Sequence, residues 1–471
     1  MLRYDACMTN EAAPRAVFLR DELIAVLGAS GVYALRMLGL YMALPIMSTW
    51  AAGLPGATPF LVGLSLGAYG LTQAIFQVPA GLLGDVRGRR LVILGSLLVF
   101  AVGCAIVAVA PSIHFVVLGR LVQGVGAMAS TLIALIGDVT REQVRTRAMA
   151  LMGGVLGVAF AGGFLIGPLV SSKAGVPAVF ALAAILSVVG AILFELLVPR
   201  RLVPGLRGAR AARATTPAPW SWAEARSLLH DRSLLVLDSG IAALHAALTG
   251  LFVVLPFVLA DFLGPLELWK VYAPVLACGL AAMVWGSQQA DKKARTRLVL
   301  RTGAFTLSLG MIGLALFHRV FWGTVISLGL FVVGFAMIEP TLASLVTRFT
   351  GRTARGTAAG LFNMSQFGGA FIGGALAGLL MPYGRGVAFA TLGAVTLLWA
   401  FALAWLRNPE DIGDVTIDAP GLDGESWKAL REKLVSHPAV LEAEWSGTLI
   451  VIRHWTRLVS QDDLSELIRR R

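Results

Sequence analysis

The chain has 471 residues, of which 57% are hydrophobic and only 14% are charged. Soluble proteins carry about 25% charged residues, so this composition excludes an ordinary soluble domain and indicates a chain largely immersed in lipid. The formal net charge is +12, but the basic residues lie in short loops between apolar runs. We therefore interpret the charge as the topology signal of a membrane protein and not as a nucleic-acid-binding surface.

Three cysteines, Cys7, Cys104 and Cys278, stand far apart in the chain, and two of them lie in apolar runs. This spacing predicts no disulfide framework, no metal site and no bound cofactor. The first apolar run extends over about residues 23–50, which is too long for the core of a signal peptide. Residues 1–21 are expected to form a cytoplasmic N-terminal segment.

Twelve apolar runs of about 20 residues or more follow this segment, six on each side of a polar stretch in the middle of the chain. Together they predict an all-α membrane protein of two six-helix bundles, 22–198 and 231–407, joined by a cytoplasmic linker at 199–230. The predicted spans are 22–50, 60–83, 90–110, 113–138, 146–171, 176–198, 233–261, 267–289, 297–317, 320–347, 356–381 and 385–406.

Basic residues are concentrated in alternate loops, which sets the orientation. Clusters such as Arg87–Arg90 and Lys292–Arg297 lie on one side, whereas the opposite loops contain only Lys173, Arg319 and Arg385 as basic residues. The basic loops and both termini are therefore predicted to be cytoplasmic. Within the linker, Trp220 and Trp222 precede a short amphipathic stretch, which is either an interfacial helix or part of a plain tether.

Residues 408–471 differ in character from the rest of the chain. Alternating and helical patterns predict the order β-α-β-β-α, which suggests a small cytoplasmic ferredoxin-like domain that lacks its last strand. No Cys-x-x-Cys occurs in its first loop, so we expect no metal there. Docking of a regulator or protein partner and a passive appendage both remain open interpretations.

Charges are concentrated at the turn after the second span, where the sequence Gly81-x3-Asp85-x2-Gly88-Arg89-Arg90 separates two apolar runs. A degraded copy, Gly286 to Arg295, follows the second span of the second half. Paired six-helix repeats place a substrate site at the midplane between the halves.

The turn at Gly81–Arg90 resembles the signature loop between the second and third helices of the major facilitator superfamily. Leu118–Gly126 resembles the arginine motif of the superfamily's fourth helix. Gly162–Pro168 resembles the glycine-proline motif of antiporters, and we assign Gly167 and Pro168 a structural role. The segments around Arg36, His245 and Glu339 look like the YajR-like branch of the drug:proton antiporters, which carries a C-terminal ferredoxin-like domain. The resemblance covers residues 22–407 and implies a drug:proton antiporter fold.

The signature turn contains candidates for a conformational switch. Asp85 is expected to cap the N-terminus of another helix, and the resemblance implies the start of the eleventh span, near Gly356. Arg89 is expected to pair with Asp138 or Glu142. Together these contacts would hold the two halves together on the cytoplasmic side in the outward-open state. In the alternative interpretation, Arg89 and Arg90 only set the topology.

Charged residues inside spans cost about 3 kcal/mol or more near the bilayer centre and are usually functional. Asp238, His245 and Glu339 are candidates for proton coupling, and His245 titrates closest to physiological pH. The alternatives are a histidine bonded to a neighbouring backbone and an Asp238 solvated at the helix end. We assign Arg36 to the cavity. Its charge requires a partner, which would be a counter-charge, a substrate anion or backbone carbonyls. Arg120 is assigned a structural role, joining spans through carbonyls.

Polar side chains recur at helical spacing in three spans. They either line a water-filled cavity, which we favour, or form interhelical hydrogen bonds. These residues are Tyr33, Tyr69, Gln73, Gln77, Asn363 and Gln366.

We therefore expect a proton-coupled exporter of small amphipathic compounds in a bacterial-type inner membrane, working by alternating access. Its partners would be the substrate, protons and the bilayer, with a protein partner possible only at the C-terminal domain. No nucleophile–base pair appears, so no catalytic residue is assigned. The alternatives are a membrane sensor that signals through the C-terminal domain and a facilitator without proton coupling.

Overall fold

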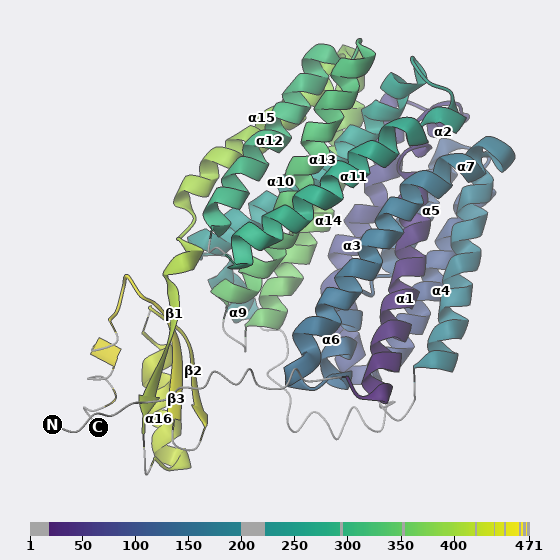
Figure 1. Cartoon of the computed structure of the whole chain (residues 1–471). Coiled ribbons are helices and arrows are strands. Elements are labelled where there is room, and N and C mark those ends of the chain that lie inside the picture. The colour runs from purple at the N-terminus through teal and green to yellow at the C-terminus, as the bar shows by residue number, and fades with distance from the viewer. Residues whose placement is uncertain are drawn as a thin grey trace.

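The computed structural model describes residues 18–198, 222–292, 295–350, 354–419, 422–437, 439–446, 449–460, 463–464 and 468. Two helical bundles stand side by side, and a small α/β domain lies beyond one end of the second (Figure 1). Of the predicted linker, Trp222–Leu228 forms the short helix α9, and residues 199–221, with Trp220, lie outside the described part.

The first bundle contains six crossings formed from seven helices. Their bounds are α1 Arg20–Ala43, α2 Met47–Ala52, α3 Pro59–Arg87, α4 Arg89–Ala108, α5 Ile113–Val125, α6 Ala129–Val139 and α7 Glu142–Leu197. The second bundle contains α10 Arg232–Ala260, α11 Trp269–Ser287, α12 Thr296–Phe317, α13 Phe321–Phe349, α14 Arg355–Leu380 and α15 Arg385–Ala402.

Eleven helices of the described chain are long and apolar enough to cross a membrane, and the longest, α7, crosses twice. Gly175, inside α7, has φ 79° and ψ 166°, which breaks the helix. A Cβ at Gly28 would meet Val198, and one at Gly167 would meet Met42. The C-terminal end of α7 therefore lies beside the start of α1, whereas Gly167, near the middle of α7, lies beside the end of α1, so the chain folds back at Gly175. Ten single crossings and one double crossing give the predicted twelve, so this is a multi-pass integral membrane protein.

The fourth crossing, predicted as one helix over 113–138, is interrupted between α5 and α6. A Cβ on Gly126 would lie 2.5 Å from the Ser96 carbonyl oxygen, so only glycine permits this approach to α4. The break frees backbone carbonyls inside the bundle. One of them, the carbonyl of Ala127, accepts a hydrogen bond from the Ser96 hydroxyl at 2.9 Å. A discontinuous helix in a membrane protein is tolerated where side chains satisfy the freed groups.

The two bundles touch most closely at the end opposite the basic loops, which we call the periplasmic end. A Cβ on Gly63 of α3 would lie 2.2 Å from the Gly374 oxygen of α14, and one on Gly70 would lie 2.5 Å from the Phe367 oxygen. The aromatic ring of Phe164 in α7 also packs against two rings of the second bundle. The distances between ring centroids are 5.0 Å to Phe252 and 5.5 Å to Tyr272. Backbone-to-backbone contact of this kind closes the periplasmic end.

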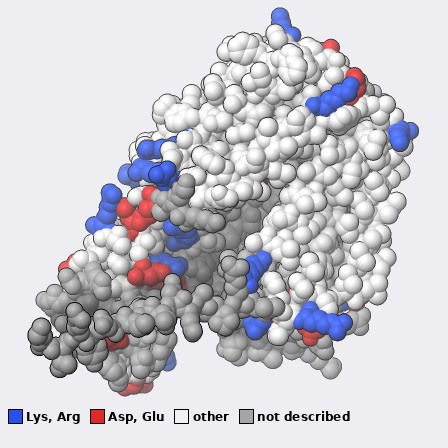
Figure 2. Space-filling view, in the orientation of Figure 1, with Lys and Arg blue, Asp and Glu red and all other residues white. Residues whose placement is uncertain are grey.

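At the cytoplasmic end the bundles diverge (Figure 1). A Cβ added at Gly153, Gly154 or Gly157 of α7, or at Gly356 of α14, would meet nothing within 4 Å. The surface is hollowed between the two halves toward the end that carries the C-terminal sheet (Figure 2). The structure is therefore inward-open.

The C-terminal domain has the predicted element order. Strands β1 Ile412–Asp418, β2 Val440–Ser446 and β3 Leu449–Trp455 form an antiparallel sheet in the order β1-β3-β2. Val415 and Ala443 both oppose Ile452. The helix α16, Gly424–Val435, covers that face with Leu434. Of the predicted last helix only residues 463, 464 and 468 are described, and they are helical.

Closure of the periplasmic end depends on the absence of side chains at the α3–α14 contact. We expect Gly63→Ala to force the two helices apart there and to shift the protein toward the outward-open state. Pulsed EPR distances between labels at Lys173 and Arg319, in a background without native cysteines, should lengthen. Gly95→Ala is the control, because a Cβ at Gly95 meets nothing within 4 Å. Equal distances in both variants would contradict this account of the gate.

Candidate functional site

Three side chains from three helices of the second bundle form what we call the coupling cluster: His245 of α10, Glu339 of α13 and Gln366 of α14. His245 Nε2 lies 2.8 Å from Gln366 Nε2 and 3.7 Å from Glu339 Oε1. The other ring nitrogen, Nδ1, lies 3.3 Å from the Ile241 carbonyl oxygen. The sequence singled out these residues separately, and the fold brings them together.

The hydrogen-bond partners of His245 are those of a neutral imidazole ring. A carbonyl oxygen only accepts, so Nδ1 carries a hydrogen and donates to Ile241. Nε2 then accepts from the amide nitrogen of Gln366, which makes the ring neutral. A proton added at Nε2 would turn this acceptor into a donor, requiring Gln366 to present its oxygen or Glu339 its carboxylate. One ring nitrogen thus links the charge of His245 to that of Glu339.

Glu339 is the member of the cluster that water reaches. Its side chain is 41% exposed although it lies within α13, about 15 Å from the cytoplasmic end at 1.5 Å per residue. Because the bundles are closed at the periplasmic end and open at the other, this exposure is to the cytoplasmic hollow. Pro340 follows directly inside the helix and removes a backbone donor there.

Asp238 lies on α10 two turns before His245 and is buried. Its enclosure does not match the alternative of a carboxylate solvated at the helix end. No hydrogen bond or ion pair links it to another residue of the described chain. A charged carboxylate in such a place is costly, so Asp238 belongs with the titratable groups of the second bundle.

Arg36 is enclosed in the first bundle, with 1% of its surface exposed. Its Nη2 donates to the Gly126 carbonyl at 2.8 Å, to Tyr69 Oη at 3.3 Å and to Gln73 Oε1 at 3.4 Å. The guanidinium also lies 4.8 Å from the centre of the Phe100 ring. In this conformation its partners are a carbonyl and neutral side chains, and the carbonyl is one that the break in the fourth crossing frees.

The polar residues of α3 are buried as well, which corrects the favoured cavity assignment. Gln73 donates to Gln77 at 3.2 Å, and the carbonyl of Gln77 accepts from Ser130 of α6 at 3.0 Å. In this inward-open state Tyr69, Gln73 and Gln77 match the alternative of interhelical hydrogen bonding. Tyr33 is also buried, whereas Asn363 and Gln366 of α14 are half-buried.

Arg120 ties the second and fourth crossings together. Its Nε donates to the Ser65 carbonyl at 3.0 Å, and its Nη2 to the Leu66 carbonyl at 3.3 Å. Nη1 donates to Gln123 Oε1 at 2.7 Å, and the guanidinium lies 5.1 Å from the Tyr69 ring centre. These contacts are of the kind expected for a structural arginine.

Gly167 of α7 permits a close approach to α1, since a Cβ on Gly167 would lie 2.1 Å from the Met42 carbonyl oxygen. Pro168 follows Gly167 within α7.

The signature turn places its two adjacent arginines in different environments. Gly88, at φ 94°, is the single residue between α3 and α4, and only glycine adopts this conformation readily. Arg89 Nε contacts Asp138 Oδ2 of α6 at 2.5 Å, and its Nη2 contacts Asp85 at 3.2 Å. A Cβ at Gly81 would approach Ser130 of α6 at 3.3 Å. Arg89 therefore joins α3, α4 and α6.

Arg90 instead points to the end of α7. Its Nε donates to the Glu195 carboxylate at 2.8 Å, and Nη1 and Nη2 donate to the carbonyls of Val198 and Glu195, each at 3.0 Å. It thereby caps the C-terminus of the sixth crossing. The side chain of Glu142 is not described, and the contact of Asp85 with the start of α14 stays a prediction for the outward-open state.

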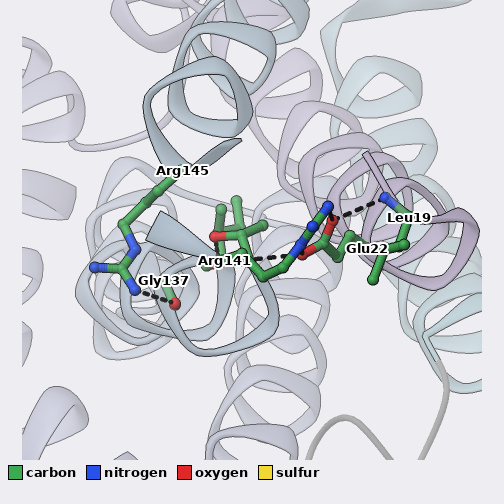
Figure 3. Close-up of polar contacts among 7 residues, drawn as sticks. Leu19, Glu22, Gly137, Arg141 and Arg145 are labelled. Carbon is green, nitrogen blue, oxygen red and sulfur yellow. Dashed lines mark hydrogen bonds and ion pairs between the residues drawn. The ribbon is translucent and has the colours of Figure 1, made fainter. Parts of the chain in front are cut away.

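One polar joint, between Glu22 and Arg141, escaped the sequence analysis, which assigned no role to either residue. The Glu22 carboxylate is buried and accepts from the backbone N–H of Leu19 at 2.8 Å and of Arg141 at 3.0 Å. Arg141 adds Nε at 2.8 Å and Nη2 at 3.1 Å (Figure 3). Beside it Arg145 donates to the Gly137 carbonyl at 3.2 Å. The joint ties the start of α1 to the start of α7. Its only sequence signal is a glutamate in the first turn of a span.

The two arginines of the turn should differ when each is replaced. Arg89→Ala is expected to reduce transport severalfold with little loss of stability, because its contacts lie at the partly exposed switch. Arg90→Ala should lower the free energy of unfolding by about 1–3 kcal/mol, because it removes partly buried charged hydrogen bonds. Thermal unfolding in detergent and transport in vesicles measure the two effects. Indistinguishable behaviour of the two variants would contradict this division.

The Glu22 joint should be a stability determinant. Glu22→Ala leaves two backbone donors and Arg141 without their shared acceptor, which we expect to cost about 1–3 kcal/mol. Glu267→Ala is the matched control, since its pair with Lys270 is exposed and such pairs contribute about 0–1 kcal/mol. A Glu22→Ala variant as stable as the control would rule out this role.

Comparisons of sequence identify the family. A model described as the Major Facilitator Superfamily matches residues 29–374 and 268–455. The chain is 36% identical over 429 residues to the inner membrane transport protein YajR of Escherichia coli strain K12, covering 89% of this chain and 91% of that protein. It is also 37% identical over 114 residues to a class E tetracycline resistance protein of Escherichia coli, covering 24% of this chain and 27% of that protein.

Solved structures share the fold. The human organic anion transporter MFSD10 aligns with a TM-score of 0.58 at 20% identity, over 81% of this chain and 99% of its own. A bacterial homologue of the lysosomal transporter Spinster aligns with a TM-score of 0.63 at 14% identity, over 84% of this chain and 98% of its own. With the match to most of its length and the 36% identity to YajR, the chain belongs to the major facilitator superfamily of membrane transporters.

Proposed function

We propose that this transporter exports small amphipathic compounds from the cytoplasm of a bacterium in exchange for protons, across the inner membrane and by alternating access. The observation that carries the proposal is the coupling cluster, where a water-exposed carboxylate and a neutral imidazole stand 3.7 Å apart inside the membrane. Ionisable groups at such depth are rare and are usually functional. The similarity to YajR, an inner membrane transport protein, and over part of the chain to a tetracycline resistance protein, supports transport of small compounds.

In this proposal each step has a direction, which is reasoned from the inward-open state. Here Glu339 communicates with the cytoplasm, so a proton carried from the other side leaves the carboxylate through the hollow. The vacated charge is then available to a substrate that enters by the same path. Separation of α3 from α14 at the periplasmic end, with closure at the signature turn, would expose the cluster to the periplasm. There a proton from the outside displaces the substrate.

His245 gives the exchange its second element. While Gln366 donates to Nε2, the ring is neutral and does not pair with the Glu339 carboxylate. A proton on Nε2 would create an ion pair with Glu339 and break the bond from the Gln366 amide nitrogen. Since these residues lie on α10, α13 and α14, the proton would change contacts between three helices at once. Such a change in differential contacts is what a conformational step requires.

Glu339→Gln should abolish proton coupling. In proteoliposomes with an imposed pH gradient, one-for-one exchange sustains about a tenfold substrate ratio per pH unit, since one unit equals 1.36 kcal/mol. We expect Glu339→Gln to reduce that ratio to about one while downhill exchange of substrate persists. Glu267→Gln, at an exposed periplasmic pair, should keep the ratio. Cationic, neutral and anionic amphipathic compounds are screened as substrates.

The control outcomes separate the alternatives. Wild-type transport that is indifferent to the pH gradient would indicate a facilitator and remove the proposal. An unchanged ratio in Glu339→Gln would remove Glu339 from the coupling site while leaving the exchange intact.

A further inference from the structure

The C-terminal domain is joined to the second bundle by a charged contact at a helix start. Glu410 lies in the short helix η6, Pro409–Asp411, directly before β1. Its Oε1 accepts the backbone N–H of Thr296, the first residue of α12, at 2.8 Å. A carboxylate at this position satisfies a free donor and complements the positive end of the helix. On the other side of η6, Arg348 of α13 donates to the Pro409 carbonyl at 3.2 Å.

An aromatic contact forms the second part of this joint. Trp455, the last residue of β3, is only 4% exposed and packs with the core of the helical bundles, not with the domain's own core. Its ring lies 5.3 Å from that of Phe349, the last residue of α13, and 5.4 Å from the Arg407 guanidinium. Arg407 in turn contacts Asp231 at the start of α10 at 3.9 Å.

The helix held by this joint also carries Glu339. Between Glu339 and Phe349 the helix contains Pro340, and beside this segment lies a small cavity of about 110 Å³ lined by Pro340, Ser344, Arg348 and Thr296, among others. The cytoplasmic segment of α13 thus borders a cavity on one side and lacks one backbone hydrogen bond at its start. The joint described above contacts this segment at its end, through Arg348 and Phe349.

We propose that the C-terminal domain braces the cytoplasmic end of α13, and that Trp455 and Glu410 are positioning residues for Glu339. The domain then moves with the second bundle as one body. In this arrangement it is neither a passive appendage nor a freely tethered sensor. The effect on coupling rests on the proposed function, whereas the brace itself is a property of the fold and is measured independently.

The brace is tested by pulsed EPR on the full chain without native cysteines. Labels at Glu432, exposed on α16, and Leu298, exposed near the start of α12, should give one narrow distance distribution in the parent. We expect Trp455→Ala to broaden it, and Glu410→Gln to broaden it less while leaving the aromatic contact in place. The matched controls are Trp405→Ala, at an exposed tryptophan near the joint, and Glu425→Gln, at an exposed glutamate of α16. A broad distribution in the parent, or no change in either variant, would overturn the brace.

The positioning of α13 has two readouts. A spin label at Thr347, exposed on α13, should gain mobility in Trp455→Ala and Glu410→Gln but not in the controls, whether or not transport is proton-coupled. In proteoliposomes the same variants should shift the pH profile of transport and lower its rate by ~2- to 30-fold, the range of measured couplings between distant sites. A released domain with unchanged label mobility, rate and pH profile would overturn the positioning role. Altered mobility with transport indifferent to pH would uphold the brace and contradict the proposed function instead.

Discussion

The backbone contact between α3 and α14 is the constraint on which the rest of the structure depends. Because Gly63 and Gly70 have no side chains, two helices from different bundles approach to backbone distance at the periplasmic end. That contact closes one end of the molecule and leaves the other open, and so determines that Glu339 communicates with the cytoplasm. The side of the membrane on which α3 and α14 meet therefore decides to which side the cluster of His245, Glu339 and Gln366 is open.

The two bundles treat their buried charges differently. In the first, Arg36 and Arg120 bond to carbonyls and neutral side chains around Tyr69, which fixes the packing of the helices. In the second, Asp238, His245 and Glu339 are ionisable side chains inside helices, and His245 lies 3.7 Å from Glu339. The first bundle thus uses its buried charges to hold helices together, whereas the second contains the residues of the proposed proton coupling.

Sequence reasoning predicted the crossings and the C-terminal domain because each depends on local patterns of hydropathy. It found His245 and Glu339 because charge in an apolar run is conspicuous, but it assigned Gln73 to the cavity. Spacing along a helix shows which residues share a face but not which neighbouring side chain that face contacts. In the structure, Gln73 contacts Arg36. The Glu22–Arg141 joint spans 119 residues, so no local pattern could predict it. The break at Gly126 likewise depends on the approach of α4.

The cytoplasmic ends of the two bundles are held together by different means. In the first bundle, side-chain pairs do this from within: Arg89 with Asp138, Arg90 with Glu195, and Glu22 with Arg141. In the second, Glu410 at the start of α12 and Trp455 at the end of α13 come from outside the bundle. Under the proposed brace, the C-terminal domain performs at these ends part of the role that side-chain pairs perform in the first bundle.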